Sequence, residues 1–195
     1  MRTGIFGGTF DPIHVGHLAV AASVHAALHL DRTLLVVANE PWQKAGATMT
    51  PAAVRYEAAA AAVADLEVDG LEASDIELQR GGPSFTVDTA AQLLAEDPAG
   101  SLFVVAGHDV LDALDTWHRV EDLRRLVTLA VVSRPGTAGE VCLPGWKVRA
   151  VEVPQIDVSS TVIRERVAAG LPVDGLVPAA AMRIYRAQAG YPGGR

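Results

Sequence analysis

The residues best suited to chemistry stand near the start of the chain, where two glycines precede two histidines. Residues 7–17 read GGTFDPIHVGH and follow a short apolar strand expected over 2–6. Glycines let the backbone approach a ligand, and the bare N–H groups of a helix starting near His14 favour an anion, most often phosphate. His14 and His17, three residues apart, share one face of that first turn. Two imidazoles placed there can donate hydrogen bonds to phosphate oxygens and stabilise developing charge.

Residues 7–17 do not fit three other ligand-binding patterns. They lack the GxGxxG of a dinucleotide-binding turn and the GxxxxGK[ST] of a P-loop kinase or GTPase. A zinc-binding helix would carry histidines four apart with a glutamate between them, which His14 and His17 do not provide. The alternative to a phosphate site is a glycine-rich turn with two surface histidines. Their joint position at a strand-to-helix junction favours the phosphate site.

A run of hydroxyl residues nearer the C-terminus, VSSTVIR over 158–164, is the second candidate for phosphate binding. Ser159, Ser160 and Thr161 are typical of a helix cap, with hydroxyls and bare N–H groups at the helix start. Arg164 follows in the first turn, and its planar guanidinium suits phosphate. An ordinary capped helix is the simpler explanation of this run taken alone. Its pairing with the histidine segment favours the phosphate site.

Apolar strands alternate with amphipathic helices along the rest of the chain, which predicts βαβ units and a parallel sheet. Continuous apolar strands also indicate burial on both faces. The fold class is therefore α/β, a single Rossmann-like doubly wound parallel sheet with flanking helices. Further strands are expected at 33–38, 71–78, 102–106, 127–132 and 148–153, and helices at 15–30, 51–65, 87–95, 160–169 and 179–187. Ligands bind such sheets at the carboxyl ends of the strands, which fall at 7–17, 39–44, 107–118, 133–136 and 157–164.

A chain of 195 residues, 50% of them hydrophobic, predicts one domain over 1–189 and a disordered tail over 190–195. The 16 Lys+Arg against 23 Asp+Glu give a net charge of −7, which argues against a protein that coats nucleic acid. The single cysteine, Cys142, excludes an intramolecular disulfide and fits a reducing, cytoplasmic compartment. The N-terminus lacks the apolar core of a signal peptide, and the alanine-rich stretch 58–64 is too short to span a bilayer. Neither secretion nor membrane insertion is expected.

The segment 8–17 resembles the (T/H)xGH signature of the nucleotidyltransferase superfamily, and SSTVIR over 159–164 resembles its SSTxxR signature. Within that superfamily the chain is similar to the bacterial nicotinate-mononucleotide adenylyltransferases, over nearly its whole length. Three middle segments carry this closer resemblance: NEPWQK at 39–44, GPSFTVDT at 82–89 and the pattern GHDxxxxLxxW at 107–117. The segment SRPG at 133–136 also matches the family.

The resemblance implies transfer of AMP from ATP to nicotinate mononucleotide, giving nicotinate adenine dinucleotide and pyrophosphate in NAD biosynthesis. It implies catalytic roles for His14, His17 and Arg164. The ATP-binding residues would be Gly8, Thr9, Phe10, His14, His17, Gly107, Asp109, Ser159, Ser160, Thr161 and Arg164. The mononucleotide-binding residues would be Asn39, Lys44, Phe85, Thr86, Trp117 and Arg134. Mg²⁺ would be bound through the ATP phosphates, with no residue of the chain dedicated to it.

The residue types agree with these implied roles. Trp117 can stack on a pyridine ring, while Lys44 and Arg134 supply positive charge for phosphate. Asp109 suits a contact to the ribose of ATP, and Thr86 a contact to the ring carboxylate. The alternatives are a core aromatic for Trp117, a solvated loop charge for Lys44 and a helix cap for Thr86.

The chain departs from the family pattern at two positions. His108 stands where the family usually has a small residue, and Gly175 where it usually has an aromatic. Another acceptor stays open, either nicotinamide mononucleotide or phosphopantetheine, because the two signatures do not separate acceptors. A catalytically silent nucleotide sensor is the alternative from another class. The expected partners are the two small substrates, without nucleic acid or membrane, and the resemblance allows a homo-oligomer.

Overall fold

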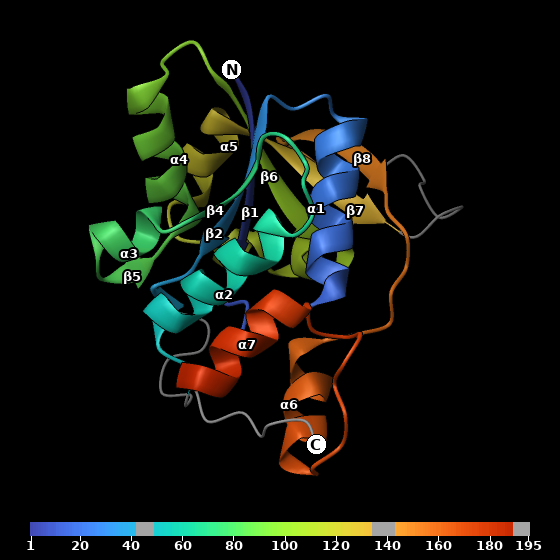
Figure 1. The fold of residues 1–195 in the computed structure, drawn as a ribbon. Helices are drawn as coiled ribbons and strands as arrows, with labels where there is room; N and C mark the ends of the chain where they lie inside the picture. The colour runs from blue at the N-terminus through green and yellow to red at the C-terminus, as the bar shows by residue number, and fades with distance from the viewer. Residues whose placement is uncertain (42–48, 134–142, 189–195) are drawn as a thin grey trace.

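A six-stranded parallel sheet forms the centre of the molecule in the computed structural model, which describes residues 1–41, 49–133 and 143–188 (Figure 1). Its strands, in their order across the sheet, are β4 (Leu71–Ser74), β2 (Arg32–Val37), β1 (Arg2–Gly8), β6 (Ser101–Gly107), β7 (Val127–Ser133) and β8 (Lys147–Glu152). Every neighbouring pair is parallel. The strand order reverses between β1 and β6, where doubly wound sheets bind ligands. The predicted fold class is confirmed.

Helices cover both faces of the sheet. They are α1 (Val15–Ala27) and α2 (Ala52–Ala64) on one face, and α4 (Thr86–Glu96) and α5 (Val120–Leu126) on the other. After the last strand come α6 (Ser160–Ala168) and α7 (Ala179–Gln188). α7 packs against α2, and α6 projects from the body of the molecule (Figure 1).

The central strands are apolar on both faces because a layer of helices buries each face. In β2, Leu35 and Val37 join the core on the side of α1 and α2, whereas Leu34 and Val36 join the core on the side of α4 and α5. All four side chains are at most 4% exposed. The strand therefore reads as a continuous apolar run, as expected for a strand inside a doubly wound sheet.

The strand predicted over 71–78 is wrong in its second half. β4 ends after four residues, and the short helix α3 (Ile76–Arg80) takes its place. The reason is a tertiary contact with α4: the Thr89 hydroxyl donates to Glu77 Oε1 at 2.7 Å and lies 3.1 Å from Arg80 Nη2, which donates to it. Only a helical turn brings Glu77 and Arg80 to the same partner.

Three further details differ from the expected elements. The first helix ends at Ala27 instead of residue 30, because His29 adopts a left-handed backbone with φ of +47°. A separate pair of parallel strands, β3 (Glu40–Pro41) and β5 (Pro83–Ser84), was not predicted. Neither was the 3-10 helix η2 (His108–Thr116) that follows β6.

The predicted tail over 190–195 and the loop residue Cys142 lie outside the described residues. In the part of the chain that the structure describes, no helix is both long enough and apolar enough to cross a membrane.

Candidate active site

The two candidate phosphate segments come together at the carboxyl end of β1. Ser160 Oγ donates to Pro12 O at 3.0 Å, across 148 positions of sequence. Arg164 Nη1 donates to Asp11 O at 2.6 Å, across 153 positions. The C-terminal signature thus contacts the loop that precedes α1, three residues before His14 in the case of Arg164 and two in the case of Ser160.

The start of α6 is capped as the sequence indicates. Ser159 is the N-cap residue, and its Oγ accepts a hydrogen bond from Val162 N at 3.2 Å. Thr161 Oγ1 accepts from Arg164 Nη2 at 3.2 Å. Together with the bond to Asp11 O, this contact fixes the guanidinium plane, while the Arg164 side chain stays exposed. A guanidinium carries five N–H donors, so it keeps donor capacity for a phosphate.

Tyr185 of α7 anchors the loop between β1 and α1 through two hydrogen bonds. The Tyr185 hydroxyl is buried, donates to Phe10 O at 2.8 Å and accepts from Ile13 N at 3.2 Å. Phe10 has φ of +49° and is 1% exposed. An added Cβ at Gly8 would lie 2.9 Å from the Phe10 ring. Gly8 is therefore required by the packing of this loop, and the Phe10 ring supports the site rather than lining it.

His14 and His17 form a reciprocal cap at the start of α1. His14 Nδ1 accepts from His17 N at 3.3 Å, and His17 Nδ1 accepts from His14 N at 3.2 Å. The two rings are stacked, with centroids 3.6 Å apart. Since each Nδ1 accepts, a neutral ring carries its proton on Nε2. Burial lowers the pKa of His14 from 6.5 to about 4, so its ring is neutral near pH 7.

Two of the first N–H groups of α1 already have partners in the protein. Val15 N donates to Leu176 O at 3.0 Å, and His17 N donates to His14. Leu176 follows Gly175, whose φ of +82° suits glycine and would strain the aromatic that the family usually has there. These two N–H groups are therefore not bare, contrary to the expectation for the start of this helix.

A cavity of about 270 Å³ opens beside this loop, between β1 and β6 where the strand order reverses. It brings together residues predicted for both substrates: Gly8 and Thr9 from the ATP group, and Phe85, Thr86 and Trp117 from the mononucleotide group. The cavity is lined by Gly7, Gly8, Thr9, Ala38, Pro41, Glu77, Ser84, Phe85, Thr86, Val87, Val104, Val105, Trp117 and His118.

Aromatic rings form one wall of the cavity. Phe85 and His118 are stacked with centroids 4.1 Å apart, and Trp117 stands beside them in the lining. Within the described residues, the buried Trp117 Nε1 has no hydrogen-bond acceptor. A flat aromatic ligand fits such a wall.

The remaining predicted residues have different placements. Asn39 donates from its N to Ser84 Oγ at 2.8 Å and from Nδ2 to Gly82 O at 3.0 Å, so it supports the cavity wall. Gly107 ends β6, and an added Cβ there would meet no atom within 4 Å. Lys44 and Arg134 lie outside the described residues, and so does the side chain of Asp109.

Three residues that contact this region were missed by the sequence reasoning: Glu77, His118 and Arg55. Glu77 and His118 line the cavity; Glu77 lies inside the strand predicted over 71–78, and His118 follows Trp117 directly in sequence. Arg55 is a charged residue on the buried face of α2, between Val54 and Ala58. An arginine among the apolar positions of this helix was the sequence signal that could have indicated a buried cation.

The chain matches the family model described as cytidylyltransferase-like over residues 5–166. It is 42% identical over 179 residues to a probable nicotinate-nucleotide adenylyltransferase of Saccharopolyspora erythraea, covering 91% of this chain and 83% of that protein. A counterpart from Streptomyces coelicolor is 43% identical over 178 residues, covering 91% and 94%. Among solved structures, Plasmodium falciparum nicotinic acid mononucleotide adenylyltransferase complexed with NaAD has a TM-score of 0.80 over 97% of each chain at 15% identity. That structure shares the fold.

Proposed function

Because the chain belongs to the nicotinate-nucleotide adenylyltransferases of the cytidylyltransferase-like family, we propose that it transfers AMP from ATP to nicotinate mononucleotide. The products are nicotinate adenine dinucleotide and pyrophosphate. The observation that supports this most strongly is the junction of the two signature segments, through Arg164 and Asp11, beside an aromatic cavity. The junction of the signature segments would then accept the triphosphate of ATP, and the aromatic cavity would accept the flat pyridine ring.

The reaction requires alignment more than acid–base chemistry. A phosphate oxygen of the mononucleotide attacks the α-phosphorus of ATP, one P–O bond forms, and the bond to the pyrophosphate leaving group breaks. A phosphate monoester is mostly ionised near pH 7, so the attacking oxygen needs little help from a base. Catalysis of such transfers rests on positioning and on stabilising charge at the phosphoryl oxygens.

The two imidazoles supply hydrogen-bond donors for this charge. Because Nδ1 of each ring accepts a backbone N–H, Nε2–H is the donor that each offers. In our proposal His17 donates to the α-phosphate as charge develops, and His14 with Arg164 holds the β- and γ-phosphates. Arg164 is suited to this by its fixed guanidinium plane.

The acceptor side is proposed to hold the pyridine ring against Trp117. Phe85 and His118 complete the aromatic wall, and Thr86, which lines the cavity at the start of α4, is proposed to contact the ring carboxylate. Lys44 and Arg134 remain predicted contacts to phosphate. A cytoplasmic location and a homo-oligomer are further expectations that await test.

We propose that Mg²⁺ enters the site together with the nucleotide. Among the described residues, no three histidine, cysteine, aspartate or glutamate side chains gather as metal ligands. Mg²⁺ usually takes phosphate oxygens and water, which the triphosphate supplies, and it would neutralise phosphate charge there. His14, His17 and Arg164 would then orient the phosphates from the protein side.

An acceptor panel tests the proposal directly. The purified protein is mixed with ATP, Mg²⁺ and one acceptor at a time, and pyrophosphate release is measured. We expect the highest kcat/KM with nicotinate mononucleotide. A higher value with nicotinamide mononucleotide or phosphopantetheine would assign a different acceptor. Binding of ATP with no pyrophosphate release from any acceptor would indicate a nucleotide sensor instead.

A further inference from the structure

Among the residues that the structure describes, Arg55 of α2 is the largest fully buried side chain, at 1% exposure. Its guanidinium donates to three backbone carbonyls: Nη1 to Thr9 O at 2.7 Å, Nε to Thr50 O at 2.8 Å and Nη2 to Asn39 O at 3.3 Å. These carbonyls belong to three separate segments of the chain. A buried charge is costly unless it is fully hydrogen-bonded, so the three segments must converge on this one plane.

The segments joined by Arg55 lead to opposite sides of the cavity. Thr9 lies in the lining, in the loop between β1 and α1 that carries the ATP signature. Asn39 follows β2, and its own N–H groups donate to Ser84 Oγ and Gly82 O on the acceptor side. A continuous set of hydrogen bonds therefore runs from the ATP loop through Arg55 and Asn39 to the wall that contains Ser84.

The charge of Arg55 is balanced locally. Burial lowers the pKa of the guanidinium, while the carboxylate of Asp11 and the hydroxyl of Tyr185 act in the opposite direction. Asp11 Oδ2 accepts from Thr50 N at 3.1 Å, so the same loop residue contacts both Arg55 and Asp11. Asp11 also carries the carbonyl that holds Arg164. The buried cation is thus connected to both signature segments.

We propose that Arg55 is a positioning residue that sets the distance between the ATP loop and the acceptor wall. The inference rests on the proposed function, because both substrates must be aligned for direct transfer between them. A planar guanidinium can reach three carbonyls in fixed directions, whereas a lysine ammonium offers a single point of contact. A displacement of about 1 Å at a reacting centre can cost on the order of a hundredfold in rate.

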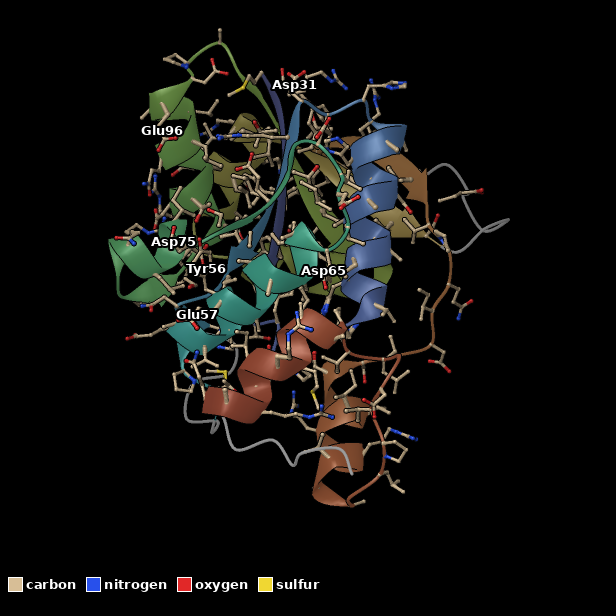
Figure 2. The ribbon with its side chains drawn as sticks, viewed as in Figure 1. Asp31, Tyr56, Glu57, Asp65, Asp75 and Glu96 are labelled. Carbon is tan, nitrogen blue, oxygen red and sulfur yellow. The ribbon has the colours of Figure 1, made fainter. Side chains whose placement is uncertain are left out.

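The test compares Arg55→Ala with Val54→Ala, which removes a buried side chain from the neighbouring position of α2. Both variants are expected to lower the thermal midpoint, so Val54→Ala controls for loss of stability. Glu57→Gln is the surface control, since Glu57 lies on the exposed side of α2 and contacts only the Gln188 amide among the bonds described for its side chain (Figure 2). kcat and both KM values are measured at a temperature where all variants are folded.

We expect Arg55→Ala to lose at least about tenfold in kcat/KM, and added guanidinium at low, non-denaturing concentration to restore much of it. Urea or sodium chloride at the same concentration should not restore kcat/KM of Arg55→Ala. Guanidinium should not raise kcat/KM of the two control variants, Val54→Ala and Glu57→Gln. A loss under about tenfold, or a loss that guanidinium does not relieve, would overturn the proposal. Should Arg55→Ala not fold, Arg55→Lys is judged by the same tenfold threshold.

The test of Arg55 can be distinguished from the test of the proposed function. The wild-type protein is first assayed with the acceptor panel, and each Arg55 variant is then compared using the acceptor that wild type prefers. A different preferred acceptor contradicts the proposed substrate and leaves the role of Arg55 to be decided by its own loss and rescue.

Discussion

The imidazoles of His14 and His17 cap each other's main chain and lie face to face. Each Nδ1 accepts the backbone N–H of the other residue, at 3.3 and 3.2 Å, and the ring centroids are 3.6 Å apart. A proton on either Nδ1 would point an N–H at another N–H. When such a ring is neutral, its proton is on Nε2, so Nε2–H is the hydrogen-bond donor of each ring.

Acid should weaken the fold through His14. The unfolded chain titrates His14 at its ordinary pKa of 6.5, whereas burial holds the folded pKa at about 4. The unfolded state thus binds the proton first, and stability present above pH 6.5 is lost as pH falls toward 4. A shift of this size corresponds to about 3 kcal/mol. Urea unfolding at a series of pH values measures it. His14→Asn keeps a capping acceptor without the titration, so an equally steep fall between pH 6.5 and 4 in that variant would refute the assignment to His14.

Two glycines at strand ends should respond differently to a side chain. Gly107→Val places its side chain in open space, so we expect the free energy of unfolding to change by about 0.5 kcal/mol or less. The ATP KM should rise about tenfold or more, because the nucleotide is expected in that space. Gly8→Ala puts a Cβ 2.9 Å from the Phe10 ring and should cost about 1–3 kcal/mol of stability. An unchanged ATP KM in Gly107→Val would exclude Gly107 from the nucleotide site.

Thr89→Val should destabilise the unit formed by α3 and α4. The change removes the hydroxyl that donates to Glu77 Oε1 at 2.7 Å, in a place where Thr89 is 0% and Glu77 6% exposed. Leaving such a buried acceptor without its donor costs about 1–3 kcal/mol. Thr89→Ser retains the hydroxyl and should lose less in urea unfolding. Equal losses in the two variants would mean that methyl packing, and not the hydrogen bond, matters at this position.

Trp117→Ala should weaken the acceptor and spare ATP. Stacking of an aromatic ligand on an aromatic side chain contributes about 1–3 kcal/mol, so the mononucleotide KM should rise about tenfold or more. The ATP KM should stay within about twofold, and Trp117→Phe should lie between wild type and Trp117→Ala. Initial rates with each substrate varied in turn measure both constants. A parallel rise of the two KM values would show that Trp117 acts on the fold of the cavity instead of on the ring.

The sequence was informative where the chemistry demands fixed residue types at fixed spacing. His14 and His17 on one helical turn, and Ser160 with Arg164 near the other end of the chain, could be selected as candidate phosphate ligands before their contacts were known. The central strands were equally clear, because burial on both faces leaves a continuous apolar run. Family membership confirmed the resemblance that these segments carry.

Contacts between distant segments were beyond the reach of the sequence. Nothing local to α2 indicates that the Arg55 guanidinium ends on carbonyls of Thr9, Asn39 and Thr50. The helix α3 was read as a strand because its pairing with Thr89 is tertiary. The first N–H groups of this helix were expected to be free for an anion, yet Val15 N donates to Leu176 O from the other end of the chain. In each case a long-range partner decides the local structure.

The most direct measurement is kcat for His17→Ala at saturating ATP, Mg²⁺ and nicotinate mononucleotide. Removing one donor to developing charge typically costs about 10²–10³-fold, and we expect a loss in that range, with the exposed residue His29 replaced by Asn as the control. Pyrophosphate release reports the rate for both variants. A fall of less than about tenfold, equivalent to less than about 1.4 kcal/mol of barrier, would contradict a catalytic role for His17.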